Sequence, residues 1–179
     1  MAIVVFVCIV SSVLLSCGEK KTREQSSSST DSSKNNKSNN ELALRQVNDQ
    51  FYASLNVMFT GNLEPMNAIW SHSKDITDLG PFGGMLVGWD SVSAEFKKEA
   101  GMKLGGKVEC TDLVAHAGTD MGYTVCTEVG QNMSAVGKPV VVSHRATNVF
   151  RLENGQWKMV HHHTDLSPQL QSATGTANK

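Results

Sequence analysis

The chain has 179 residues, of which 40% are apolar and 18% are charged, and its formal net charge at pH 7 is −1. A chain of this length and composition suits one globular domain. The balanced charge excludes the basic excess that is typical of nucleic-acid-binding proteins, so we expect no nucleic-acid partner.

The N-terminus begins with an apolar run that ends at the motif Leu14-Leu15-Ser16-Cys17. This run is too short for a comfortable membrane span. It resembles a bacterial lipoprotein signal, which implies cleavage before Cys17 and acylation of that cysteine. Basic residues follow the run and none precedes it, so an uncleaved anchor is the alternative. We expect residues 1–16 to be a signal peptide and Cys17 to be the lipidation site. The protein would then be exported and anchored to a membrane, at the outer membrane or the periplasmic face in a two-membrane bacterium.

The next segment, residues 18–40, consists of Ser, Asn, Lys and other residues without one large apolar side chain. Such a composition cannot bury enough surface to offset chain entropy. We therefore predict a disordered tether over residues 17–40, a folded domain over residues 41–168 and a frayed polar tail over residues 169–179.

The first part of the folded domain has the periodicity of amphipathic helices. Apolar residues recur at three- and four-residue spacing and stop before Gly61, which predicts a long first helix. These residues are Leu44, Val47, Phe51, Leu55 and Met58. A short second helix follows with Asn62 as its cap, and a third is predicted over residues 90–100. Residues 71–79 are typical of a short strand or an irregular edge, and residues 80–84 of a turn.

The remainder of the domain is predicted to form strands over residues 107–116, 121–130, 138–152 and 156–165. Helices followed by an antiparallel sheet define the α+β class. Asn154-Gly155 separates the last two strands, and this dipeptide predicts a hairpin with a two-residue type I′ turn.

Two cysteines, Cys110 and Cys126, fall on neighbouring predicted strands of the folded domain. A cross-strand disulfide is one possibility. Because such bridges strain the pleat, two buried free thiols are the favoured state.

The last predicted strand carries the most informative pattern. Strand alternation places on one face a row of side chains that changes from apolar at the start of the strand to polar at its end. This set is Trp157, Met159, His161, His163 and Asp165. Counting outward from the Asn-Gly turn places Asn148 opposite His161 and His144 opposite Asp165, provided that no bulge intervenes. A single bulge would instead bring Arg145, Thr147 and Val149 to that face. His162 is expected on the opposite face, in solvent or in a dimer contact.

We interpret this face as the wall of a pocket for a small molecule. The predicted ligand-binding residues are Trp157, Met159, His161, His163, Asp165, Asn148 and His144. The candidate catalytic residues are His161 or His163 as a base and Asp165 as its orienting partner, with Asn148 or Tyr123 as a donor to an oxyanion. The alternative is a hydrogen-bonded network with a structural role.

Other polar residues add weaker signals. His-x-His spacing would permit a metal ion, but it does not demand one, and we expect no metal and no cofactor. His72, Asp75 and Asp78 could rim the pocket, although such residues on a short edge are more often solvated.

Several local motifs stand out together with the order of the elements. They are Phe51-Tyr52, residues 66–70, residues 80–84 with Gly88-Trp89, residues 145–150 and residues 154–165. Over nearly all of residues 41–168 the chain resembles the NTF2-like superfamily and, within it, the SnoaL-like branch. The resemblance implies a cone in which a strongly curved antiparallel sheet wraps three N-terminal helices. It also implies a pocket at the open end and a homodimer formed through the outer sheet face.

We therefore expect an exported, lipid-anchored SnoaL-like domain that binds a small, largely apolar molecule in its cone. One alternative is an isomerase or cyclase-type enzyme that uses a His/Asp acid–base pair. A second alternative is a structural dimerisation domain, because this fold hosts many functions and cannot select among them.

Overall fold

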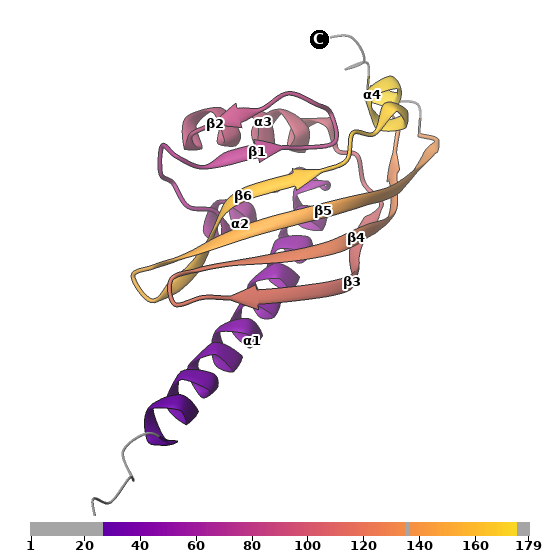
Figure 1. Cartoon of the computed structure of the whole chain (residues 1–179). Helices are drawn as coiled ribbons and strands as arrows, with labels where there is room; N and C mark the ends of the chain where they lie inside the picture. Colours follow the sequence, from indigo (N-terminus) through magenta and orange to yellow (C-terminus); the bar gives the residue numbers. More distant parts are fainter. Residues whose placement is uncertain (1–26, 135–136, 175–179) are drawn as a thin grey trace, which may run out of the picture.

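The computed structural model describes residues 27–134 and 137–174, so the predicted signal peptide and Cys17 lie outside the described residues. The helices in these ranges are α1 Ser27–Met58, α2 Glu64–Ile69, α3 Trp89–Met102 and α4 Pro168–Thr174 (Figure 1). The strands are β1 Thr77–Leu79, β2 Leu86–Val87, β3 Lys107–Ala117, β4 Met121–Met133, β5 Pro139–Glu153 and β6 Gln156–Thr164. No helix in the described part of the chain has the length and apolar character needed to cross a membrane.

The strands form one six-stranded sheet in the order β2-β1-β6-β5-β4-β3. Strands β3 to β6 form the predicted antiparallel meander. In contrast to the purely antiparallel sheet that the sequence predicts, β1 runs parallel to β6, so the sheet is mixed. This pairing is possible because α3 and the meander lie between the two strands in the chain and supply the long connection that a parallel pair needs. Figure 1 shows the sheet curving past α1, with α3 beside the β1–β2 edge.

Helix α1 starts at Ser27, inside the segment 17–40 that the composition predicts to be disordered. Its C-terminal half packs on the sheet, whereas residues 34–39 are exposed and the N-terminal half projects beyond the sheet (Figure 1). A packed helix can be extended by polar residues because each added turn needs no new nucleation. The second half of the expected tether is therefore helical.

A fourth helix, α4, occupies the start of the tail that the sequence predicts to fray. Leu170 anchors it with a side chain that is 2% exposed. Ser167 caps it, because its Oγ accepts a hydrogen bond from the Leu170 backbone N–H at 3.3 Å. One apolar residue in a polar tail is too weak a signal to predict this helix.

The hydrophobic core lies between α1 and the concave face of the sheet. The predicted apolar stripe of α1 is confirmed, because Leu44, Phe51 and Met58 are all at most 2% exposed. Fully buried side chains of other elements complete the core; among them are Met66, Trp70, Ile76, Val92, Phe150 and Met159.

The β5–β6 hairpin determines which side chains of β6 face inward. Asn154 and Gly155 have φ values of 51° and 80°, which confirms the predicted type I′ turn. Beyond the turn Phe150 pairs with Met159 as predicted, but the register then shifts, and Val149 pairs with His161. Val160 is the extra residue of this β-bulge, so every later side chain of β6 points to the other face.

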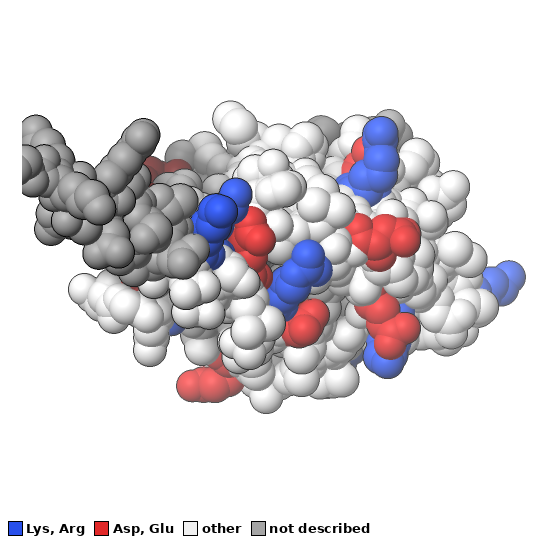
Figure 2. Space-filling model, turned by 60° about the horizontal axis from the view of Figure 1, so that its bottom comes forward, with Lys and Arg blue, Asp and Glu red and all other residues white. Residues whose placement is uncertain are grey.

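The surface carries charges of both signs. On the face shown in Figure 2, Lys and Arg side chains lie among Asp and Glu side chains with uncharged surface between them. This mixture agrees with the formal net charge of −1.

Candidate functional site

The bulge at Val160 reverses the predicted facing of the histidine cluster. His162 and Thr164 are buried on the inner face of the sheet. His161 pairs with outward-facing Val149, and His163 pairs with Thr147. His161, His163 and Asp165 therefore lie on the outer face, as in the bulged alternative that the sequence left open.

The outer side chains are engaged with one another and not with an interior pocket. Nδ1 of His161 lies 2.6 Å from Oγ1 of Thr77. The guanidinium of Arg145 donates two hydrogen bonds to the Asp165 carboxylate, each 2.9 Å long. These bonds hold the pKa of Asp165 at about 2. Asp165 thus pairs with an arginine and does not orient an imidazole as the sequence predicts.

Tyr123, Trp157 and Met159 also lie outside the interior cavity. Tyr123 is 43% exposed on the outer face, so it cannot donate into the cone. Met159 is fully buried and Trp157 is half-buried against the core, but neither lines the cavity. Of the predicted polar ligand-binding residues, Asn148 and His144 are the two that lie on the inner face with His162, and His144 also lines the cavity.

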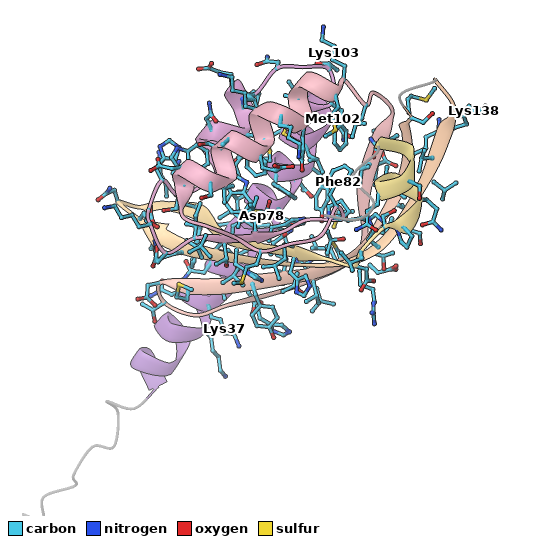
Figure 3. All side chains as sticks on the ribbon, turned by 90° about the horizontal axis from the view of Figure 1, so that it is seen from above. Lys37, Asp78, Phe82, Met102, Lys103 and Lys138 are labelled. Carbon is cyan, nitrogen blue, oxygen red and sulfur yellow. The ribbon has the colours of Figure 1, made fainter. Side chains whose placement is uncertain are left out.

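The interior cavity has a volume of about 50 Å³ and lies among α1, α3, α4 and the concave face of the sheet. Figure 3 shows Asp78 and Phe82 between α3 and the sheet, beside this space. Most of the lining is apolar. It includes Phe51, Leu55, Phe59, Met66, Trp70, Phe82, Phe96, Leu104, Val108, Val142 and Leu170.

A row of hydrogen-bonded side chains crosses the inner face next to the cavity. Asn48 of α1 accepts bonds from Asn148 Nδ2 at 2.9 Å and from Thr124 Oγ1 at 2.8 Å. Oδ1 of Asn148 lies 2.6 Å from Nδ1 of His162. Because the Asn148 amide nitrogen already donates to Asn48, its oxygen is the acceptor, and His162 carries its proton on Nδ1. The other ring nitrogen, His162 Nε2, lies 4.0 Å from Glu128 Oε1.

Glu128 of β4 is the centre of the polar part of the site. Its carboxylate accepts hydrogen bonds from Tyr52 at 3.1 Å and from Thr164 at 3.3 Å. His144 Nδ1 lies 3.7 Å from it and His162 Nε2 lies 4.0 Å from it. Burial raises the pKa of Glu128, but these neighbours outweigh burial and hold the pKa below its ordinary value. Glu128 is therefore a buried anion.

Asp78 of β1 faces the same cavity from the next strand, where it pairs with His162 in the sheet. The side chain is buried, and its Oδ1 atom has no hydrogen-bond partner among the described residues. Burial, with smaller effects of Glu95 and Glu128, raises the pKa of Asp78 to about 7. Burial also raises the pKa of Glu99 on α3, which lines the cavity beside it.

Sequence reasoning missed Glu128, and it named Asp78 as a residue that could rim the pocket but favoured a solvated position for it. Alternation could have found Glu128, because it shares the inward face of β4 with Thr124 and Cys126. Asp75 is exposed and pairs with Arg151, as an edge acid is expected to do. Asp78 differs because it pairs with His162 of β6, which is distant in the sequence, and lines the cavity together with Glu99 of α3.

Two cysteines approach the polar site from the side of β3 and β4. Cys110 and Cys126 are both free. The Tyr52 hydroxyl lies 3.1 Å from Cys126 Sγ and also donates to Glu128. Tyr52 therefore joins a buried thiol to the buried carboxylate. Among the described residues, no group of three or more His, Cys, Asp or Glu side chains is arranged to hold a metal ion.

A curved sheet closed over a long helix, with a small cavity lined by apolar side chains and buried acids, defines a cone-shaped α+β domain with an internal polar site. The model of the SnoaL-like domain family matches residues 44–167. The chain therefore belongs to this family, which confirms the resemblance stated from the sequence.

Individual relatives are distant. The chain is 23% identical over 124 residues to the F-box protein SKIP8 of Arabidopsis thaliana, with 69% of this chain and 49% of SKIP8 covered. The chain thus spans about half the length of this curated relative.

Solved structures support the fold. A provisionally named dehydratase of the NTF2-like family from Streptomyces avermitilis superposes with a TM-score of 0.63 and 21% identity, over 73% of this chain and 97% of that chain. A provisionally named calcium/calmodulin-dependent protein kinase type II association domain from Thiobacillus denitrificans has a TM-score of 0.57 and 23% identity, over 68% and 92% of the two chains. At these identities the likeness concerns the fold alone, and it confirms the NTF2-like architecture.

Proposed function

We propose that the cone binds a small, largely apolar molecule that carries a polar group. The observation that supports this proposal is an apolar cavity lined by Asp78 and His144. Their buried atoms Asp78 Oδ1 and His144 Nδ1 have no hydrogen-bond partner among the described residues, although His144 Nδ1 lies 3.7 Å from the Glu128 carboxylate. Unpaired buried polar atoms cost folding free energy, and a bound polar group would remove this cost. The cavity of about 50 Å³ is smaller than a typical drug-sized site, so the molecule has few heavy atoms.

Native mass spectrometry of the protein purified without denaturation tests this function. A cavity-filling variant, Val142→Phe, should lose the retained mass, because Val142 lines the cavity. Val87→Phe is the matched control, since Val87 of β2 is 51% exposed and does not line the cavity. Retention of the same mass by both variants, or no retained mass in the parent, would contradict the proposal.

An isomerase or cyclase-type activity is the second candidate. This activity is favoured because Asp78, whose pKa is about 7, and the anionic Glu128 line the same cavity. The imidazoles of His144 and His162 lie beside Glu128. A carboxyl group with a pKa near the working pH can both take and return a proton. In this proposal Asp78, His162 and Glu128 replace His161, His163 and Asp165 as the candidate catalytic residues. Loss of turnover in Asp78→Asn, with the fold retained, would distinguish an enzyme from a binding domain.

We also propose that the domain forms a homodimer through the outer face of the sheet. Exposed apolar side chains on this face include Val114, Tyr123 and Val141. An association domain is among the similar structures, which is consistent with assembly but concerns only the fold. An apolar centre with a charged rim is the usual composition of such a contact.

Export and lipid anchoring through Cys17 complete the proposal. They rest on the Leu14-Leu15-Ser16-Cys17 motif after an apolar run. An anchored domain of this kind would present its cone to the space outside the membrane, where it would bind its small molecule.

A further inference from the structure

The charged groups around the interior cavity are of one sign. Three carboxyl side chains line it from three elements: Asp78 of β1, Glu99 of α3 and Glu128 of β4. No Lys or Arg among the described residues lines it. The two imidazoles that line it, His144 and His162, lie beside Glu128. The anionic Glu128 would repel an anionic ligand, whereas a cation would find an unpaired negative charge on Asp78 once that group is ionised.

Asp78 is the carboxyl group that is available to such a ligand. Glu128 is already bonded to Tyr52 and Thr164, whereas Asp78 Oδ1 has no partner and its side chain is 4% exposed. Because buried acceptors are normally hydrogen-bonded, we expect a ligand in the cavity to donate a hydrogen bond to this atom.

Asp78 also lies on the boundary between the cavity and the outside. It lines a second, outer hollow of about 320 Å³ between α3 and the β1–β2 segment, together with Glu95, Lys98 and Glu99. Lys98 is bonded to Glu95 at 2.6 Å, so its charge is matched there. A ligand that enters through this hollow meets acidic side chains before it reaches the apolar interior.

The apolar walls of the cavity are rich in aromatic rings. Five rings contribute from different parts of the fold: Phe51, Phe59, Trp70, Phe82 and Phe96. Aromatic faces attract cations through their quadrupole, and the attraction is strongest where water is excluded. The unpaired Trp70 Nε1–H carries no charge, so it does not offset the acidity of the lining.

We infer that the cavity takes a small alkylammonium ligand, a primary or secondary amine in its protonated form, with Asp78 as its counter-charge and hydrogen-bond acceptor. This inference rests on the proposed function and names the class of molecule bound. A quaternary ammonium does not fit, because it has no N–H to satisfy Asp78 Oδ1.

Protonation of Asp78 should also make the binding of an amine depend on pH. The groups that face Asp78 are Glu95, Lys98 and Glu99 from α3, Glu128 from β4 and His162 from β6. Since the pKa of Asp78 is about 7 without a ligand, a bound cation must displace a proton below that pH. Amine affinity should therefore rise with pH through this range, whereas the affinity of a neutral ligand should not.

The test compares three probes with four-carbon chains and different head groups: n-butylamine, 1-butanol and butyrate. Affinities for the purified protein are measured from NMR chemical-shift titrations at about pH 8.5, where the amine is protonated and Asp78 is ionised. Butylamine should bind about fivefold more tightly than butanol, because a charge-assisted hydrogen bond is stronger than a neutral one. Butyrate should bind most weakly. Near pH 5.5 the preference for butylamine over butanol should disappear.

Two variants locate the effect. Asp78→Asn should remove the preference for butylamine and leave the affinity for butanol within about twofold, since the amide fills the same space without the charge. Asp75→Asn is the matched control, because Asp75 is exposed, pairs with Arg151 and does not line the cavity. This control should keep the preference.

The outcomes separate the inference from the proposed function. If butanol or butyrate binds at least as tightly as butylamine, or if the preference survives in Asp78→Asn, the inference is overturned while binding of a small apolar molecule stands. If none of the three probes binds, both fail. Preference for butylamine in the parent and in Asp75→Asn, with its loss in Asp78→Asn, supports the inference.

Discussion

His162 Nδ1 lies 2.6 Å from Asn148 Oδ1, and this bond joins β6 to the neighbouring strand β5. Asn148 in turn donates to Asn48 of α1, so three elements share one buried network. The His162 ring also packs against Phe51, with a distance of 5.2 Å between the ring centroids. His162 is therefore held by hydrogen bonds on one side and by an aromatic contact on another.

The first prediction compares His162→Ala with His163→Ala. Loss of His162 should lower the free energy of unfolding by about 2 to 3 kcal/mol, because it leaves Asn148 unsatisfied and opens space beside Phe51. His163 is exposed, so its replacement should cost no more than about 0.5 kcal/mol. Chemical denaturation of both variants measures the difference. Equal losses, or a greater loss for His163→Ala, would show that the inner face has been assigned to the wrong histidines.

The contrast between these histidines also shows how far sequence reasoning reaches in this fold. The Asn-Gly turn correctly predicts the pairs nearest to it, including Phe150 with Met159. Counting by strand alternation assumes that each residue of β6 pairs with one residue of β5. It therefore cannot locate an extra residue such as Val160. No local sequence pattern marks the position of such a bulge, which shows only in the strand register of the fold. The predicted α+β class and the four-stranded meander are confirmed, β2 and α4 are additions that the sequence did not predict, and the predicted facing of His161, His163 and Asp165 is wrong.

The burial of Asp78 is a second feature that the sequence does not predict. An acid on a three-residue strand is predicted to be solvated, since local sequence gives no sign of a cover. In the structure β1 joins the edge of β6 in parallel, and Phe96 and Glu99 of α3 line the same cavity. Burial of Asp78 thus depends on contacts between segments that are far apart in the chain, and such contacts are visible only in the folded structure.

The second prediction concerns the proposed dimer. Tyr123→Lys should convert the protein to a monomer at micromolar concentration, because it places two like charges near the centre of a self-complementary contact. Sedimentation velocity measures the state of the parent and the variant. Asp120→Lys is a control outside the strands, and it should leave the dimer intact. A parent protein that sediments as a monomer throughout this range removes the basis of the dimer proposal.

The third prediction concerns the lipid anchor. Cys17→Ser should release the protein from membranes, because the serine cannot carry the thioether-linked lipid that the lipoprotein signal implies. Fractionation of cells that express the parent and the variant measures the change. Cys8→Ser is the matched control, since Cys8 lies within the apolar run and would be removed with it by the proposed cleavage before Cys17. Membrane retention of Cys17→Ser as firm as that of the parent would favour an uncleaved apolar anchor.

The last prediction links Asp78 to stability. Its pKa of about 7 in the folded protein lies above the ordinary value of 3.8, so the folded state binds a proton more tightly than the unfolded state does. The contribution of Asp78 to the free energy of unfolding should therefore fall as pH rises from about 4 to about 7 and then level off.

Asp78→Asn removes this titration, because the amide stays neutral at every pH. The variant should match the parent near pH 4 and become more stable than it above pH 7, by about 2 to 4 kcal/mol. Differences between the two proteins cancel the titration of other groups to first approximation, so urea denaturation at several pH values isolates the effect. Asp75→Asn should show no such gain, since Arg151 holds the pKa of exposed Asp75 below its ordinary value. A stability difference that is independent of pH would mean that Asp78 is ionised in the folded protein throughout this range, and its place as the protonated acid of the cavity would be lost.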